Sequence, residues 1–173
     1  NKPISLRVVE PLYLSFRHGQ SLPCHQTEAI DLGKEHGLLQ DSGDSVGAIA
    51  TFFGTVRDFN ETRKVESISI EHYSGMTESE LKKILNEAKA RWKISAGTII
   101  HRVGKLHVGE GIVFVGIASS HRKDAFQSCD FIMDYLKTNA PLWKKERHDG
   151  GEDWVSSRES DQVFARSWEK GSH

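Results

Sequence analysis

Apolar residues recur at helical spacing in two segments of the chain. The first apolar stripe consists of Leu81, Ile84, Leu85, Ala88 and Trp92, and the second of Ala125, Cys129, Ile132, Met133 and Leu136. Side chains three and four residues apart lie on one face of a helix, which marks a buried side. A capping box at Thr77-Glu-Ser-Glu80 precedes the first stripe. We therefore predict one helix from about Thr77 and another from about Ser119 or Ser120 to Thr138.

Five further segments have the pattern of β-strands. Residues 47–53 are a short apolar run between glycines, as in a strand buried on both faces, whereas residues 65–73 alternate between apolar and polar positions. Further strands are predicted at 98–103, 112–118 and 142–147, with a last helix or irregular tail from about residue 160. The order from Val65 to Arg147 is β-α-β-β-α-β, a split βαβ arrangement with helices on one face of a largely antiparallel sheet. The predicted fold class is therefore α+β.

The predicted elements follow one another at short intervals, so residues 27–170 are interpreted as a single domain. Residues 1–26 contain an apolar stretch followed by a polar loop, and they form an N-terminal extension to which no role is assigned. Residues 171–173 are set aside as a possible cloning remnant. A chain of 173 residues is long enough for such a domain to bury a sizeable core.

Charge and cysteine content narrow the class of protein further. The formal net charge of -1 argues against binding nucleic acid through overall charge, so any basic site must be local. Cys24 and Cys129 are the only cysteines, which supports neither a disulfide framework nor a zinc site and fits a reducing cytosol. The sequence has neither a membrane-spanning run of about 18 apolar residues nor the features of a signal peptide. We therefore expect a cytoplasmic protein without a bound metal or cofactor.

The second predicted helix is followed by a proline with one lysine on each side of it. Pro141 cannot continue a helix and pushes Ala140 out of helical geometry, so the chain must turn between Lys137 and Lys144. Lys137 lies in the last helical turn, where a cation suits the helix dipole, and Lys144 lies at the start of an extended segment. Two solvated lysines are the ordinary explanation of such a pair. Basic residues elsewhere in the chain favour a functional explanation.

Two other groups of basic residues lie at the ends of predicted elements. Arg57 follows the buried strand, and His121, Arg122 and Lys123 occupy the first turn of the second helix. Cations in a first turn oppose the helix dipole, but the free N–H groups there, reinforced by Arg122, would hold a phosphate or carboxylate. If both groups converge with the lysines that flank Pro141, they form a cationic pocket suited to a phosphorylated small molecule.

Five ordered motifs resemble those of the large, catalytic subunit family of molybdopterin synthase. They are Gly47-Ala-Ile-Ala-Thr-Phe-Phe-Gly-Thr-Val-Arg-Asp58, Glu71-His-Tyr-Ser-Gly-Met-Thr77, Ile100-His-Arg-Val-Gly104, Ser119-Ser-His-Arg122 and Asp134-Tyr-Leu-Lys-Thr-Asn-Ala-Pro-Leu-Trp-Lys-Lys-Glu146. Arg158-Glu-Ser-Asp161 is also similar to the family pattern. The resemblance covers about residues 27–168, and five motifs in consistent order make it specific.

This resemblance implies a fold and an activity. The family has an α/β hammerhead fold with a small β subdomain. It converts cyclic pyranopterin monophosphate to molybdopterin, in molybdenum cofactor biosynthesis, by transfer of two sulfurs from the thiocarboxylated C-terminal Gly-Gly of a small ubiquitin-like subunit. The resemblance therefore implies a sulfurtransferase that forms a homodimer and binds one small subunit on each copy, giving a heterotetramer.

Residue roles are implied by the same motifs. Lys137 matches the main catalytic lysine of the family, and Lys144 matches its companion. The positions at which the family contacts its substrate are occupied here by Thr55, Val56, Arg57, His121, Arg122, Lys145 and Glu146. Several of these residues are also singled out by the charge pattern.

Two other functions are compatible with parts of the pattern. Split βαβ sheets often bind RNA, but that use calls for aromatic residues on basic strands, and residues 112–118 carry only Phe114. A non-catalytic α+β module that binds a phosphate ligand would account for a cationic pocket without requiring two lysines around a proline. Salt-dependent RNA binding would favour the first alternative, and tight ligand binding without turnover would favour the second.

Overall fold

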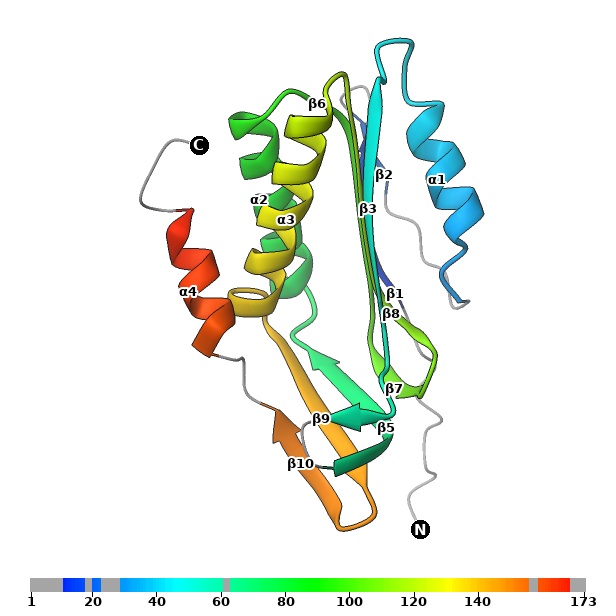
Figure 1. Ribbon diagram of the computed structural model, residues 1–173, viewed down its shortest axis with the longest axis vertical. Helices are drawn as coiled ribbons and strands as arrows, with labels where there is room; N and C mark the ends of the chain where they lie inside the picture. Colours follow the sequence, from blue (N-terminus) through cyan, green and yellow to red (C-terminus); the bar gives the residue numbers. More distant parts are fainter. Residues whose placement is uncertain (1–10, 18–19, 23–28, 61–62, 156–158, 169–173) are drawn as a thin grey trace.

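The computed structural model of the chain describes residues 11–17, 20–22, 29–60, 63–155 and 159–168, and it contains two antiparallel β-sheets (Figure 1). The larger sheet has the strand order β2-β1-β6-β8-β3. Its strands are β1 (Pro11–Arg17), β2 (Gln20–Leu22), β3 (Ala48–Thr55), β6 (Ile94–Arg102) and β8 (Gly111–Ser119). Residues 11–17, which the sequence placed in an extension of unclear role, therefore pair with β6 inside this sheet.

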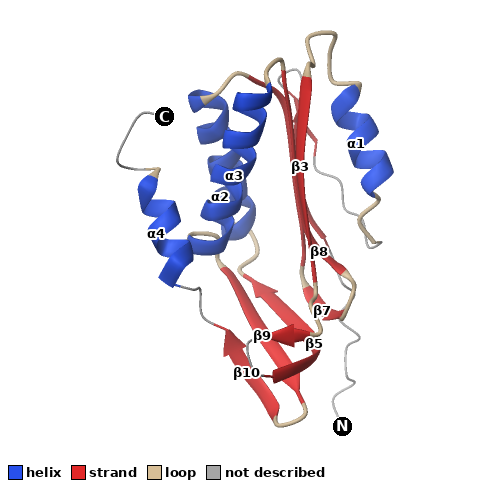
Figure 2. Cartoon of the chain, in the orientation of Figure 1, coloured by secondary structure: helices blue, strands red, loops and turns tan. Residues whose placement is uncertain are grey.

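The smaller sheet forms the lower part of the molecule in Figure 2 and corresponds to the small β subdomain that the resemblance implied. Its strand order is β10-β9-β5-β4, and β7 also pairs with β5. These strands are β4 (Phe59–Asn60), β5 (Arg63–His72), β7 (Gly104–His107), β9 (Leu142–His148) and β10 (Gly151–Val155). The predicted split βαβ unit is thus divided, because β5 and β9 pair in this sheet whereas β6 and β8 pair in the larger one.

The helices confirm the α+β class and correct one detail of the predicted arrangement. Helices α2 (Met76–Arg91) and α3 (Arg122–Thr138) cover one face of the larger sheet, as predicted, and α4 (Glu159–Ser167) packs against α3 (Figure 1). Helix α1 (Leu32–Gln40), which was not predicted, lies on the other face. Among the described residues, no helix is long and apolar enough to cross a membrane.

Helix α1 lacked a clear pattern because Gly33 and Gly37 interrupt a sequence of low apolar content. Its N-cap is Asp31, whose side chain accepts a hydrogen bond from the Lys34 N–H at 3.0 Å. Leu39, which is fully buried, approaches β8 where Gly116 has no side chain. A Cβ at Gly116 would lie 2.5 Å from Leu39 Cδ1, so a larger residue would force the buried Leu39 side chain to shift.

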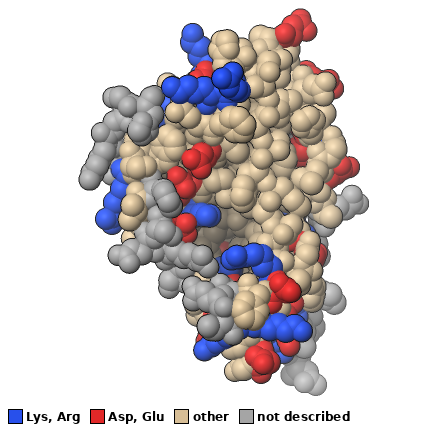
Figure 3. All heavy atoms as spheres, viewed as in Figure 1, with Lys and Arg blue, Asp and Glu red and all other residues tan. Residues whose placement is uncertain are grey.

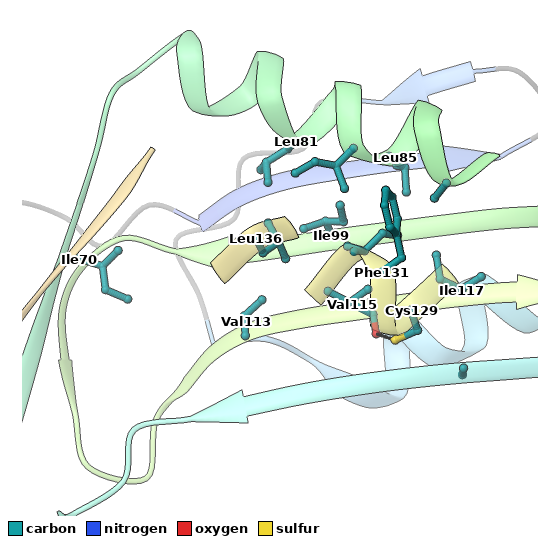
Figure 4. Close-up of a cluster of buried hydrophobic side chains, with 14 of the residues drawn as sticks. Ile70, Leu81, Leu85, Ile99, Val113, Val115, Ile117, Cys129, Phe131 and Leu136 are labelled. Carbon is teal, nitrogen blue, oxygen red and sulfur yellow. Dashed lines mark hydrogen bonds between the residues drawn. The ribbon is translucent and has the colours of Figure 1, made fainter. Parts of the chain in front are cut away.

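Strand β8 is the centre of the core because apolar side chains point from both of its faces. Val113, Val115 and Ile117 belong to the cluster beneath α2 and α3, together with Ile99 of β6 and Phe131 of α3 (Figure 4). The alternate residues of β8, Phe114 and Ala118, pack with Leu39 and Ile100 on the α1 side. This double burial explains why the sequence of the strand is a continuous apolar run rather than an alternating one.

The start of α2 differs from the predicted capping box. Gly75, with a φ of 84°, is the N-cap, and its N–H donates to Glu78 Oε2 at 2.5 Å. Thr77 is instead buried within the first turn, where its hydroxyl lies 3.0 Å from the Tyr73 carbonyl and 3.2 Å from the Pro141 carbonyl. Thr77 therefore joins the start of α2 to the segment that connects α3 with β9.

Candidate active site at the end of helix α3

The junction between α3 and β9 has the geometry that the proline predicted. Helix α3 ends at Thr138, and the N–H of its C-cap Asn139 donates to the Tyr135 carbonyl at 2.8 Å. Lys137 lies in the last turn of α3, and Lys144 is the third residue of β9. Because the Pro141 carbonyl accepts from Thr77, the turn between the two lysines is held by α2 as well as by its own backbone.

Each lysine of the pair has a carboxylate partner. Lys137 Nζ lies 3.4 Å from Asp161 Oδ1, which α4 supplies, and Lys144 Nζ lies 2.6 Å from Glu146 Oε1. The side chains of Lys137 and Lys144 are 50% and 39% exposed, whereas those of Asp161 and Glu146 are 17% and 11% exposed. The two cations are thus accessible from solvent while the carboxylates that hold them lie mostly inside.

Lys144 and Glu146 line a small pocket at the end of β3. The remaining lining residues are Thr55, Val56, Arg57, Phe59, Val65, Ile68 and Ile112. The segment after β3 is fixed by its backbone, since the Val56 N–H donates to the Glu110 carbonyl and the Gly109 N–H donates to the Val56 carbonyl, both at 2.9 Å. Figure 3 shows the molecule hollowed between the helices and the smaller sheet, with basic and acidic side chains around the hollow.

Lys145 lies on the opposite face of β9 from Lys144, because successive side chains of a strand alternate between faces. Its ammonium group lies 2.7 Å from Glu152 Oε2 and 5.6 Å from the centre of the Trp154 ring, and both partners belong to β10. A second hollow on that face is lined by Lys145, Lys105 and Arg147, among others. Of the two lysines after Pro141, only Lys144 therefore faces the pocket at the end of β3.

His121 and Arg122 lie at the other end of α3 from Lys137. His121 is the N-cap residue of the helix, and both residues line a separate hollow with Lys123, Phe126 and Gln127. At about 1.5 Å per residue, the 15 positions between Arg122 and Lys137 separate them by roughly 22 Å. The basic groups whose convergence would form one cationic pocket therefore do not all meet within a single copy of the chain.

Burial changes the titration of two residues of α3. Cys129 lies in the core, and its burial raises the pKa of the thiol to about 12, so it is the small core residue that the sequence predicted. Asp134, one turn before Lys137, has a pKa raised above its usual value, chiefly by partial burial and against the effect of a hydrogen bond from Trp168. Cys24 lies outside the described residues. The described residues contain no group of three or more His, Cys, Asp or Glu that could hold a metal ion.

Three residues at the site had no role predicted from the sequence. Phe59, which is 53% exposed, lines the pocket beside Arg57, and Asp161 and Trp168 approach α3 from the C-terminal segment. The motif ending at Asp161 was the only signal available for the last two residues. Their contacts with α3 depend on how α4 docks, which a pattern along the chain does not reveal.

The sequence of this chain is similar to a known family and to its curated members. The family described as MoaE protein matches residues 25–139. The molybdopterin synthase catalytic subunit of Pasteurella multocida (strain Pm70) is 51% identical over 143 residues, covering 83% of this chain and 95% of the relative. That of Pseudomonas aeruginosa is 50% identical over 145 residues (84% and 97%), and that of Escherichia coli (strain K12) is 47% identical over 141 residues (82% and 93%).

Solved structures resemble this one over most of the chain. The molybdopterin biosynthesis MoaE protein from Burkholderia ambifaria MC40-6 has a TM-score of 0.70 and 46% identity, covering 82% of this chain and 93% of that structure. Molybdopterin synthase from Staphylococcus aureus has a TM-score of 0.69 and 29% identity, with 75% and 93% covered. The complex of subunits 1 and 2 of molybdopterin-converting factor from Helicobacter pylori 26695, at 21% identity and a TM-score of 0.62, shares the fold over 75% of this chain and 87% of that one. The chain therefore belongs to the MoaE family, whose curated members are named molybdopterin synthase catalytic subunits.

Proposed function

We propose that this chain is the catalytic subunit of a molybdopterin synthase and acts as a sulfurtransferase. It would transfer two sulfurs to cyclic pyranopterin monophosphate from the thiocarboxylated C-terminal Gly-Gly of a small ubiquitin-like subunit. The names of relatives that are 47–51% identical support this proposal.

Cys129 is a free thiol, and we propose a location in the reducing cytoplasm.

The observation that carries the proposal is the pair of accessible lysines around the turn at Pro141. Lys137 and Lys144 project from two different elements, and the turn between them is restrained by α2. Lys144 shares its pocket with Arg57, so cationic groups are available to a substrate that carries phosphate and to a tail that carries a thiocarboxylate. Two surface lysines without a function would not require such a fixed turn.

Each sulfur transfer would take place in two steps. The thiocarboxylate sulfur forms a bond to a pterin carbon while a carbon–oxygen bond of that carbon breaks, and the oxygen leaves as water or as a phosphate oxygen. The product is an acyl thioester between the two molecules. Water then breaks the acyl–sulfur bond, so the tail leaves as a carboxylate and the sulfur stays on the pterin. Lys137 and Lys144 would stabilise the negative charge that develops and exchange protons with sulfur and water. A relay through Cys129 is disfavoured, because its buried thiol has a pKa raised to about 12.

We include His121 and Arg122 in the proposed site as residues that a second copy of the chain would contribute. They are roughly 22 Å from the Lys137 end of α3, a distance that a small substrate does not span. Strand β3 is an edge of the larger sheet, and its Ala48 end pairs with Ser119, two residues before His121. If two β3 edges met antiparallel, the first turn of α3 in one copy would approach the Thr55 end of β3 in the other. Homodimerisation would thereby complete the basic site. The position of Lys145 lends no support to a substrate contact, and its role stays a prediction.

The direct test mixes the purified chain with a thiocarboxylated small subunit and cyclic pyranopterin monophosphate and measures the dithiolene product. We expect product to form only with the thiocarboxylated form of the small subunit, and sedimentation to give a dimer that grows when the small subunit is added. Tight pterin binding without product in the complete mixture would instead identify a non-catalytic ligand-binding module.

A further inference from the structure

We propose that Asp161 is a positioning residue for Lys137, and that α4 functions as a brace which carries this carboxylate to the end of α3. The inference rests on the proposed function, because it assigns to Asp161 the task of holding the lysine that takes part in sulfur transfer. Asp161 itself lies behind Lys137 and acts on the substrate only through that lysine.

The contact between the two side chains is suited to positioning. Lys137 is half exposed and has a long, flexible side chain, so on its own its ammonium group would sample many positions. Asp161 is only 17% exposed, and its Oδ1 lies 3.4 Å from Lys137 Nζ. Asp161 is the third residue of α4, where the helix dipole favours a carboxylate. A mostly buried, well-placed acid thus restrains a mobile, accessible cation.

The far end of α4 is anchored to the same helix. The Trp168 indole N–H donates to Asp134 Oδ2 at 2.9 Å, and its ring packs edge-on against Phe131 and Trp92 at centroid distances of 5.6 and 5.7 Å. The Trp168 carbonyl accepts a hydrogen bond from Arg91 at 2.9 Å. A helix of nine residues is marginal by itself, so these contacts order α4 on α3.

The two attachments of α4 lie one helical turn apart on α3. Asp134 accepts the hydrogen bond from Trp168, and Lys137, three residues later, forms the ion pair with Asp161. The brace therefore spans the last turn of α3, directly before the turn at Pro141. A carboxylate delivered from such an anchored helix has a fixed position relative to the helix that carries the lysine.

A purely structural ion pair would behave differently from a positioning one. Ion pairs with an exposed partner contribute little to stability, so loss of the Asp161 charge should leave the fold intact. The same loss frees Lys137, and misplacement of a catalytic group costs rate rather than stability. The two roles are therefore separated by comparing turnover with thermal unfolding.

The experiment compares Asp161→Asn and Asp161→Glu with the wild-type protein, each mixed with the thiocarboxylated small subunit and cyclic pyranopterin monophosphate. We expect Asp161→Asn to lower kcat about 10-fold with little change in KM, and Asp161→Glu to recover part of the loss. Glu80→Gln is the matched control, because it removes a 3.7 Å ion pair within α2 to Lys83, whose side chain is 61% exposed. This control should keep both wild-type kinetic constants and the wild-type Tm.

A second arm places Asp161→Asn in the Lys137→Ala background. If Asp161 acts through Lys137, the double variant should be no slower than Lys137→Ala alone. Relaxation of the Lys137 side chain, measured by NMR on the whole protein, should also show greater mobility in Asp161→Asn, and this reading does not require turnover. An unchanged kcat and mobility in Asp161→Asn, or a further loss in the double variant, would overturn the positioning role. Wild-type protein without turnover would instead refute the proposed function, and full activity of Lys137→Ala would refute the catalytic role of Lys137 on which the positioning role depends.

Discussion

The two ends of α3 both carry basic side chains, but their surroundings differ. At the first turn, His121, Arg122 and Lys123 lie at the positive end of the helix dipole, with Asp124 as the acidic residue of that turn. At the last turn, Lys137 lies at the negative end and is paired with Asp161. Cations concentrated at a helix N-terminus are adapted to hold an anion, whereas a cation braced by a carboxylate is adapted to stay in one position. One end is thus suited to substrate binding and the other to chemistry.

The residues between these ends fix α3 on the larger sheet. Ala125, Cys129, Ile132 and Leu136 are buried against the larger sheet, so α3 is held along its whole length. A helix fixed in this way keeps its two ends at a constant separation. The same rigidity prevents the two basic groups of one copy from acting on one small molecule, so the proposed shared site depends on a second copy of the chain.

Removal of Lys137, the lysine paired with Asp161, should have the largest effect on activity. Lys137→Ala should lower product formation at least ~100-fold, because proton transfer and charge stabilisation are lost together. The free energy of unfolding should change by no more than about 0.5 kcal/mol, as for most exposed side chains. Single-turnover assays and denaturant titration measure the two quantities. Lys82→Ala, at an exposed position of α2, is the control, and turnover close to wild type in Lys137→Ala would exclude the catalytic assignment.

Removal of a cation from the opposite end should act mainly on affinity. Arg122→Ala should weaken binding of the pterin monophosphate by about 1.5–3 kcal/mol, the range for a charge-assisted hydrogen bond. Isothermal titration of the purified protein measures this loss of affinity, and the loss should be smaller for Lys123→Ala if Arg122 is the phosphate contact. Equal affinity in Arg122→Ala and wild type would mean that the phosphate binds elsewhere.

Mixing the two variants tests whether both ends of α3 serve one site. Neither Arg122→Ala nor Lys137→Ala can form an intact site with itself, but a mixed dimer has one site with both residues present. Random exchange of copies should therefore restore about a quarter of wild-type activity. The control mixes Lys137→Ala with a Lys137→Ala, Arg122→Ala double variant, which should restore nothing. Mixtures that never exceed the mean of the separate variants would show that the two ends act independently.

The middle of α3 should contribute stability and no chemistry. Cys129→Ala should cost about 1 kcal/mol of unfolding free energy, because a buried side chain is shortened. Its activity should stay close to wild type, since the burial that raises the Cys129 pKa to about 12 keeps the thiol protonated at neutral pH. Combining it with Cys24→Ser should leave most of the turnover. Loss of turnover in a well-folded Cys24→Ser protein would make a thiol part of the mechanism.

The smallest effect is expected on the stability of the Asp134→Asn variant, because Asp134 accepts the hydrogen bond that anchors the C-terminal end of α4. The pKa of Asp134 is raised in the folded state, so folding favours its protonated form. Its ionisation therefore costs stability that is absent below its ordinary pKa of 3.8 and is fully felt above the raised value. Asp134→Asn keeps an oxygen for the Trp168 N–H and removes this cost. The variant should gain no more than about 0.5 kcal/mol relative to wild type as pH rises from 3 to 7. Urea titrations at several pH values measure the difference in unfolding free energy between Asp134→Asn and wild type. A difference that stays constant from pH 3 to pH 7 would contradict a raised pKa of Asp134.

Local rules along the chain predicted much of this site. Pro141 requires a break after a helix, so the positions of Lys137 and Lys144 in α3 and β9 were predicted and confirmed. Alternation along β9 also implies that Lys144 and Lys145 point to opposite faces. The convergence of His121 and Arg122 with Lys137, which the charge pattern raised as a condition, does not occur within one chain, and the length of the predicted helix already placed these residues far apart.

By itself, the sequence determined the elements whose patterns are local: the buried face of α3, the strand β8, and the lysines on each side of Pro141. Motif order also determined the family to which the chain belongs. Only the tertiary structure decided how the strands divide between two sheets, that α1 covers the second face of the larger one, and that Asp161 meets Lys137. Asp161 is 24 residues beyond Lys137, and their contact depends on Trp168 packing against Phe131. The physical reason is that periodicity reports which face of an element is buried, whereas the partner of that face is chosen by packing among residues distant in the chain.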